Sequence, residues 1–403
     1  MQDLIVVTRI FSGIEDIVTT EHWEHSGSPA YYHFIRKLDL RKDISYKLFL
    51  LSSKLIGNNR KKTLVFDNLN VVANIVPYYP ILFSKYIPFL GKIEFFYNKI
   101  IQYIYILFKT YKVKNYYIDR DNILLTFILL AMPRSNIVFT RLLGVPESIY
   151  RHLTYRNNIY SRIIKWTFSH NRSYFFCTND GSYAEEVSKK FGSDRFYLLF
   201  NGIDKGLLSV FNPDRNKEDL KTIKIAYVSR IEPGKGHVTI IEALNKIHTT
   251  SGIIVHMIGD GRLNNECKKL VKKYGLCDTV LFLGRLPHDK TISYISNSDV
   301  FISINYDGSF GNGVLEAATL GIPVVTLQHK SFLSNKYHQF FRFIENHEKI
   351  EDDLVKFLED FMRNRLLRNT MSRGSIKFSN RYLVSWDNRI DTEIDIMTSV
   401  YNQ

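Results

Sequence analysis

The sequence predicts an α/β protein built from two doubly wound domains, each a mostly parallel sheet covered by helices. The clearest indication is the stretch 224–327, in which apolar strands alternate several times with amphipathic helices. The N-terminal half shows the same alternation less regularly. Strands separated by helices of this length pair in parallel through crossover connections. A length of 403 residues also favours two cores over one.

Composition indicates a globular protein of a reducing compartment. Apolar residues make up 45% of the chain, which is ordinary for a packed domain. Three scattered cysteines, Cys177, Cys267 and Cys277, lack metal-ligand spacing and fit the cytoplasm. The N-terminal segment lacks the basic region and cleavage site of a signal peptide, and no apolar run approaches the roughly 20 residues that a spanning helix needs.

The net charge of +14 favours an anionic partner, such as a phosphate-bearing substrate, a phospholipid or nucleic acid. A lysine-rich solvated surface would give the same charge, so the value alone does not identify the partner. No basic and aromatic face typical of a nucleic-acid-binding module is visible, and we expect no nucleic-acid partner.

The first domain is expected to span residues 1–204. Its expected strands are Leu4–Thr8, Lys62–Phe66, Tyr116–Asp119, Ile137–Thr140, Ser173–Thr178 and Phe196–Phe200. A helix should begin near Ala30, because Ser28 suits an N-cap and Pro29 suits the first helical position. The polar, turn-rich stretch between Gly202 and Lys221 is the expected boundary of the domain.

Residues 79–112 interleave aromatic and aliphatic side chains with five lysines. A basic, aromatic, amphipathic segment can lie in the headgroup layer of an anionic membrane. The alternative is a core-facing helix pair whose lysines are solvated or extend their apolar stems along the surface. A helix is expected to begin after Pro88, since proline does not fit the middle of one.

The second domain, expected at 205–380, places polar residues where its strands end. Its first strand, Lys224–Ser229, is followed by a loop with Arg230 and Lys235, and then by a helix with apolar positions at 240, 241, 243, 244 and 247. Ligands of parallel sheets bind beyond the carboxyl ends of the strands. A planar guanidinium and a mobile ammonium in one loop can hold the same pair of phosphates.

A glycine-rich turn near the end of this domain reads Gly308-Ser309-Phe310-Gly311-Asn312-Gly313 and opens a helix that carries Glu316. Backbone amides at a helix N-terminus bind anions, and a carboxylate can accept hydrogen bonds from ribose hydroxyls. Taken singly, these residues are more often surface ions or local salt-bridge partners. Their occurrence together at successive strand ends predicts a nucleotide site.

The order of these motifs resembles the C-terminal domain of family four glycosyltransferases of the GT-B fold, of the type that builds polysaccharides. The resemblance covers 224–327, including Gly259-Asp260-Gly261, Phe282-Leu283-Gly284 and Pro323-Val324-Val325. Residues 201–204 (NGID) resemble the family's motif between the domains, and 381–403 its closing helix, which packs back on the first domain. The resemblance implies two Rossmann-like domains facing across a cleft.

By this resemblance, Arg230 and Lys235 stabilise the leaving nucleotide diphosphate and Glu316 contacts the ribose, with no metal or other cofactor required. The expected donor site comprises Gly13, Gly259, Gly261, Asp307, Gly308, Ser309, Phe310, Gly311, Asn312 and Gly313. The first glutamate of the family's paired motif is missing, since Gly308 stands there, and neighbouring Asp307 could replace it. Arg141 stands near the position of a frequent family histidine, and with Ser12 it is expected at the acceptor cleft.

The resemblance therefore implies a cytoplasmic enzyme, and the basic segment 79–112 could place it peripherally on the inner face of the cytoplasmic membrane. It would move a hexose from a UDP- or GDP-sugar, with retention, to a lipid-linked or oligosaccharide acceptor in O-antigen or capsule synthesis. Two alternatives remain: a degenerate GT-B subunit that only binds, favoured by the missing glutamate and histidine, and a nucleotide-sugar 2-epimerase of the same architecture.

Overall fold

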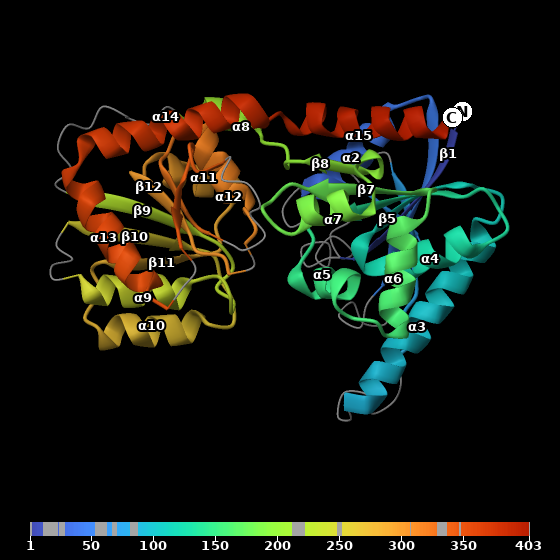
Figure 1. Cartoon of the computed structure of the whole chain (residues 1–403), viewed down its shortest axis with the longest axis horizontal. Coiled ribbons are helices and arrows are strands. Elements are labelled where there is room, and N and C mark those ends of the chain that lie inside the picture. The colour runs from blue at the N-terminus through green and yellow to red at the C-terminus, as the bar shows by residue number, and fades with distance from the viewer. Residues whose placement is uncertain are drawn as a thin grey trace. The chain divides into compact units, whose positions relative to one another are not determined.

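The computed structural model describes residues 2–10, 23, 29–52, 63–66, 71–80, 88–211, 222–247, 252–306, 308–328, 337–345 and 348–402. The chain forms two compact α/β units, each with its own sheet (Figure 1). The first comprises Met1–Thr178, Val187–Leu199 and Trp386–Gln403, and the second comprises Asn179–Glu186 and Phe200–Ser385. The expectation of two Rossmann-like, largely parallel domains is confirmed.

The sheet of the first unit has the strand order β3-β4-β2-β1-β5-β6-β7-β8. Its pairs are parallel except for the short edge strand β3, which runs antiparallel to β4. The strands are β1 (Gln2–Arg9), β2 (Ile44–Leu51), β3 (Thr63–Val65), β4 (Val72–Val76), β5 (Asn115–Asp119), β6 (Ile137–Leu142), β7 (Ser173–Thr178) and β8 (Phe196–Leu199).

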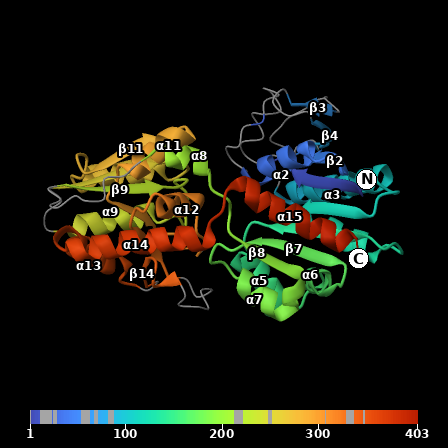
Figure 2. The same ribbon diagram turned by 90° about the horizontal axis from the view of Figure 1, so that it is seen from above.

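Helices cover both faces of this sheet, and the last helix of the chain is among them. They are α2 (Pro29–Leu40), α3 (Pro88–Lys109), η2 (Arg120–Asn122), α4 (Ile123–Ala131), α5 (Glu147–Thr154), α6 (Ile159–Ser169), α7 (Ala184–Phe191), η3 (Ser193–Arg195) and α15 (Trp386–Tyr401). Figure 2 shows α15 lying beside α2 on one face. Ile390, Ile394 and Met397 of α15 are buried in the same apolar cluster as Phe34 of α2.

The second unit is built around a six-stranded parallel sheet of order β11-β10-β9-β12-β13-β14. Its strands are β9 (Ile223–Val228), β10 (Ile253–Ile258), β11 (Val280–Gly284), β12 (Val300–Ser303), β13 (Val324–Leu327) and β14 (Arg342–Ile344). Its helices are α8 (Lys205–Ser209), α9 (His237–Lys246), α10 (Asn264–Lys273), α11 (His288–Ser296), α12 (Asn312–Thr319), α13 (Ile350–Arg363) and α14 (Arg365–Tyr382). The predicted apolar face of α9 is buried.

Two strands of the first unit, β2 and β4, were not expected from the sequence. Both lie inside the sheet, between β1 and the edge. In a short apolar run, periodicity alone does not distinguish a strand from a segment of a buried helix, and this explains why the two strands were not predicted. The expected strand at 62–66 is present only as the three-residue edge strand β3.

The division between the units falls at Leu199/Phe200, five residues before the expected end of the first domain, and residues 179–186 group with the second unit. The final helix joins the first unit from Trp386 onward. Within the residues that the structure describes, no helix has the length and apolar character needed to cross a membrane.

Candidate nucleotide site and a cavity of the first unit

The candidate nucleotide site lies at the carboxyl edge of the second sheet, at the point where strand order reverses. From β9 the chain adds β10 and β11 on one side, and then returns to add β12 on the other side. The connections that leave β9 and β12 therefore run in opposite directions and open a crevice between them. The loops after β9, β10 and β12 carry the residues predicted for the donor.

Arg230 and Lys235 occupy the loop between β9 and α9. Arg230 is exposed, whereas Lys235 is half-buried and donates from Nζ to Oδ1 of Asn305 at 2.9 Å. The backbone of this loop is fixed because the buried hydroxyl of Tyr227 donates to the carbonyl of Lys235 at 2.7 Å. Two cationic side chains thus lie on one loop at the end of β9, and a hydrogen bond fixes the backbone of this loop.

Asn305 connects this loop to the glycine-rich turn after β12. Its Nδ2 donates to the backbone carbonyl of Ser309 at 2.8 Å and to the Ser309 hydroxyl at 2.6 Å. A chain of hydrogen bonds thus runs from Lys235 through Asn305 to Ser309. Two separately predicted segments are brought together by a residue that the sequence did not single out.

The predicted glycines Gly259 and Gly261 allow the backbone after β10 to approach the loop that carries Arg230. A Cβ on Gly259 would lie 2.0 Å from the carbonyl oxygen of Ser229, and Gly259 adopts a φ of +137°. A Cβ on Gly261 would lie 2.4 Å from the carbonyl oxygen of Ile231. These glycines therefore shape the Arg230 loop through close backbone packing.

Turn residues 308–313 divide into a packed part and an open part. Phe310 is buried among Tyr337, Phe341 and Phe343, so its ring anchors the turn in the core. Asn312 accepts a hydrogen bond at Oδ1 from Nδ2 of Asn201, at 2.8 Å. Open space surrounds Gly311, the N-cap of α12, where a Cβ would meet nothing within 4 Å.

Glu316 lies one turn into α12 and is largely buried, with 14% of its side chain exposed. Its Oε1 lies 2.8 Å from Nε2 of His288, the first residue of α11. This hydrogen bond to Glu316 raises the pKa of His288 above its ordinary value, against the opposing effect of burial. His288 thus fixes the carboxylate of Glu316 from a neighbouring helix, and this contact was not predicted from the sequence.

A second histidine near the site also escaped prediction. His237 opens α9, is 2% exposed, and has Nε2 3.3 Å from the Ser229 hydroxyl. Burial, reinforced by the positive charge of Lys235, lowers the pKa of His237 to about 4. His237 is therefore neutral at physiological pH and adds no positive charge beside the two expected cations.

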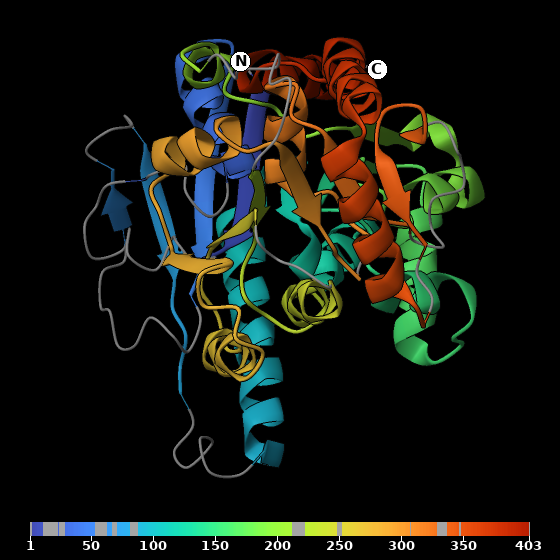
Figure 3. The same ribbon diagram turned by 90° about the vertical axis from the view of Figure 1, so that its left-hand side faces the viewer.

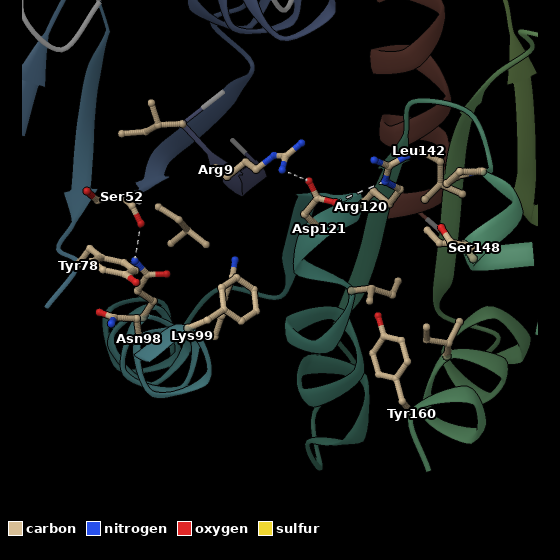
Figure 4. A pocket seen from close by; sticks show the side chains of 18 of the residues that line it. Arg9, Ser52, Tyr78, Asn98, Lys99, Arg120, Asp121, Leu142, Ser148 and Tyr160 are labelled. Carbon is tan, nitrogen blue, oxygen red and sulfur yellow. Dashed lines mark hydrogen bonds and ion pairs between the residues drawn. The ribbon is translucent and has the colours of Figure 1, made fainter. Parts of the chain in front are cut away.

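The first unit contains a cavity of about 830 Å³ at the carboxyl ends of its own strands (Figure 4). It lies where strand order reverses around β1, with β2 on one side and β5 on the other. The lining residues include Arg9, the last residue of β1, together with Ser52 after β2 and Asp121 after β5. Lys99 of α3 and Tyr160 of α6 face the cavity from opposite walls.

The two walls differ in character. The α3 wall is mainly polar, with Glu94, Asn98, Lys99 and Gln102 beside Phe95, whereas the opposite wall is mainly apolar, with Ile123, Leu142, Pro146, Ile149, Ile164 and Phe168. Arg9 pairs with Asp121 at 2.6 Å, and Lys99 donates to Asn122 at 2.7 Å. Burial lowers the pKa of Lys99. The cavity thus offers cationic and amide groups facing apolar side chains.

Arg141 does not belong to this cavity, in contrast to the expectation that it lines an acceptor cleft. Its side chain is 1% exposed, and its guanidinium pairs with Glu393 at 2.6 Å. It is therefore inaccessible to a substrate and serves instead to hold α15. Ser12, Gly13 and Asp307 lie outside the described residues. Among the residues described, no group of three or more His, Cys, Asp or Glu side chains could hold a metal ion.

Comparisons with known proteins find a family match within the second unit. Residues 211–378 match the family Glycosyl transferases group 1. The chain is 25% identical over 180 residues to N-acetylgalactosamine-N,N'-diacetylbacillosaminyl-diphospho-undecaprenol 4-alpha-N-acetylgalactosaminyltransferase of Campylobacter jejuni. That alignment covers 44% of this chain and 48% of the relative, so the match spans about half of the relative's length.

Solved structures resemble the whole chain. Sucrose-phosphate synthase from Thermosynechococcus elongatus superimposes with a TM-score of 0.72 at 14% identity, covering 100% of both chains. The Anabaena protein HepE, solved with UDP and glucose, gives a TM-score of 0.64 at 13% identity, covering 99% of this chain and 100% of its own. At such identities these likenesses show the GT-B fold alone.

Proposed function

Because residues 211–378 belong to the glycosyl transferases group 1 family, we propose that this protein transfers a hexose from a nucleotide-sugar to a glycan acceptor. One observation carries the proposal. The loop with Arg230 and Lys235 and the glycine turn before Glu316 leave adjacent strands, and the Lys235–Asn305–Ser309 hydrogen bonds join them. A nucleoside diphosphate can be contacted by both segments at once.

In this proposal Arg230 and Lys235 stabilise the charge that develops on the departing diphosphate, and Glu316 receives the ribose hydroxyls. The donor is a UDP- or GDP-sugar, and the sugar is transferred with retention. Two cations and the backbone amides at the start of α12 supply positive potential at the leaving group. We therefore propose that transfer needs no metal ion, so a chelator should leave the rate unchanged.

The acceptor is proposed to bind in the first unit, in the 830 Å³ cavity. Its polar and apolar walls suit a lipid-linked glycan, which joins an anionic phosphate to a sugar and an apolar chain. The Campylobacter relative is named for such a diphospho-undecaprenol substrate. Surface polysaccharide synthesis at the inner face of the cytoplasmic membrane is the setting that we propose.

The direct test measures UDP and GDP binding by calorimetry, together with release of the nucleotide from matching sugar donors. Replacing Arg230 or Lys235 with alanine removes a charge-assisted hydrogen bond to phosphate, so binding should weaken roughly 10- to 100-fold. Lys272→Ala, an exposed lysine on α10, is the matched control and should bind normally. Unchanged binding in both site variants would remove the basis of the proposal.

Two alternatives give different results in the same assays. A subunit that only binds, which the missing first glutamate favours, would bind nucleotide but release none with any donor or acceptor. A 2-epimerase would change the sugar of the donor without an acceptor present. Transfer that depends on an added lipid-linked acceptor, with the anomeric configuration followed by NMR, distinguishes the proposed reaction from both.

A further inference from the structure

The helix α3 is amphipathic in the reverse of the usual sense. A helix packed on a globular protein in water normally buries its apolar stripe and exposes its polar one. In α3 the buried positions at four-residue spacing include Glu94, Asn98 and Gln102, each at most 2% exposed. The outward positions are instead occupied by large apolar side chains.

Specific hydrogen bonds hold the polar face of α3 against the first unit. Tyr78 donates to Glu94 at 2.6 Å, and Asn98 exchanges two bonds with the backbone of Tyr79, at 2.6 and 2.9 Å. Gln102 donates to the carbonyl of Ser52 at 3.0 Å. The orientation of the helix is therefore fixed, because a rotated helix would bury these groups without partners.

The outward face is apolar along the length of the helix. Its side chains are Phe89, Phe96, Ile100, Ile104 and Phe108, which are 69, 58, 59, 60 and 76% exposed. Figures 1 and 3 show the first turns of α3 extending beyond the rest of the first unit. A contiguous apolar stripe of this size is typical of a surface that meets another apolar phase or partner.

The charges around this face identify the occupant. Lys92, Lys109 and Lys112 are exposed along the helix and at its end. The sole acidic residue in 88–112 is Glu94, which faces inward. An apolar stripe whose exposed charged neighbours within 88–112 are lysines matches an anionic lipid surface. The acyl chains of the lipid receive the ring and aliphatic groups, and its headgroups pair with the ammonium groups. Two copies of the face would bring like charges together.

We propose that the first unit docks on an anionic lipid bilayer through the outward face of α3, with the helix axis lying along the membrane surface. The inward face of the same helix forms the polar wall of the cavity. The docked helix therefore separates the cavity from the lipid by its own width, so an acceptor anchored in the bilayer needs to extend only about 10 Å to reach it. The access of an acceptor to the cavity rests on the proposed function, whereas the docking of α3 on lipid does not.

The test is flotation of the full chain with vesicles, in the absence of donor and acceptor, so that its outcome is independent of transfer activity. Wild-type protein should float with phosphatidylglycerol–phosphatidylcholine vesicles, float less in high salt, and stay unbound with phosphatidylcholine alone. The triple variant Phe96→Gln, Ile100→Gln, Ile104→Gln should bind at least about tenfold more weakly. Because these side chains are exposed, its thermal midpoint should equal that of the wild type.

Two matched controls complete the design. Val210→Gln with Leu366→Gln removes exposed apolar side chains from the second unit and should bind as wild type. Lys92→Gln, Lys109→Gln, Lys112→Gln should weaken binding about 100-fold, whereas the equally charged Lys269→Gln, Lys272→Gln, Lys273→Gln on α10 should change it little.

The proposal is overturned if the apolar triple variant floats as well as the wild type. A second outcome would also overturn the proposal. If the wild type is a dimer in solution, and this variant is a monomer that still binds lipid as well, the outward face of α3 joins two copies of the chain instead. Flotation without transfer would leave the docking surface standing and contradict the proposed function alone.

Discussion

Nε2 of His288 lies 2.8 Å from Oε1 of Glu316, which ties the start of α11 to the second turn of α12. The carboxylate is thereby held in one orientation by a neighbouring helix. If Glu316 receives ribose hydroxyls, His288 acts on the nucleotide through Glu316 as a positioning residue. His288→Ala should then weaken UDP binding by about threefold to tenfold, roughly 1 kcal/mol, because the nucleotide keeps its direct contacts and Glu316 loses only its orientation.

A nucleotide that lacks the ribose hydroxyls distinguishes this effect from a general loss of structure. Binding of 2′,3′-dideoxyuridine diphosphate should be equally weak in the wild type and in His288→Ala. His288→Gln can still donate to the carboxylate and should recover part of the affinity. Equal losses for both nucleotides would contradict the positioning role.

The His288–Glu316 pair also predicts the direction in which folding stability changes with pH. The pKa of His288 is raised by its bond to Glu316, so the folded state holds this proton more tightly than the unfolded chain. The resulting stabilisation is complete below about pH 6.5, the ordinary histidine value, and is lost as pH rises through the raised pKa. Thermal unfolding of wild type and His288→Gln across this range should converge at alkaline pH.

His237 should make the stability depend on pH in the opposite direction. Its pKa of about 4 lies below the ordinary value, because burial and Lys235 disfavour the charged form. Between about pH 6.5 and 4 the unfolded chain binds a proton that the folded chain does not, so stability should fall as the pH falls. The full effect is about 3 kcal/mol. His237→Gln should remove it, and a variant with unchanged acid sensitivity would contradict this assignment.

The close packing at Gly259 predicts that this glycine maintains the Arg230 loop. Gly259→Ala would place a Cβ 2.0 Å from the carbonyl of Ser229 at a φ of +137°, so the loop must shift. We expect a loss of about 2 kcal/mol or more in unfolding free energy and weaker UDP binding. Gly206→Ala in α8, whose Cβ would meet Asp204 at an ordinary 3.5 Å, is the control.

The strand-end argument from sequence located the parts of the nucleotide site that depend on backbone topology. Arg230, Lys235 and the turn before Glu316 follow strands that proved to be neighbours, because parallel strands place their carboxyl ends on one edge. The helix face of α9 was predictable for a similar reason, since Ile240 and Leu244 repeat at helical spacing.

The side-chain pairs of the site were not predictable in this way. His288 and Asn305 meet partners on other elements, and a single contact between two elements leaves no period in the sequence. Arg141 stood close to a functional position of a related family but forms a buried ion pair. The orientation of α3 was equally hidden, because an amphipathic pattern indicates two faces without saying which one is buried.

Arg141 and Arg389 share the carboxylate of Glu393 at 2.6 Å each, and all three side chains are at most 2% exposed. Tyr117 adds a hydrogen bond, accepting from Nη1 of Arg141 at 2.9 Å. Burial, the largest single influence, would lower the pKa of Arg141, but Glu393, Tyr117 and Tyr31 together outweigh burial and raise it. This cluster holds α15 on the first unit, so its loss should lower the free energy of unfolding.

Glu393→Ala would leave two buried guanidinium groups without a counter-ion, which should cost about 3–5 kcal/mol of unfolding free energy. Denaturant unfolding of the full chain measures this loss. Removing the charges together, in Arg141→Met, Arg389→Leu, Glu393→Leu, should recover most of it, because apolar groups of similar size replace the whole cluster. A single variant as stable as the wild type would show that the cluster does not hold α15 in place.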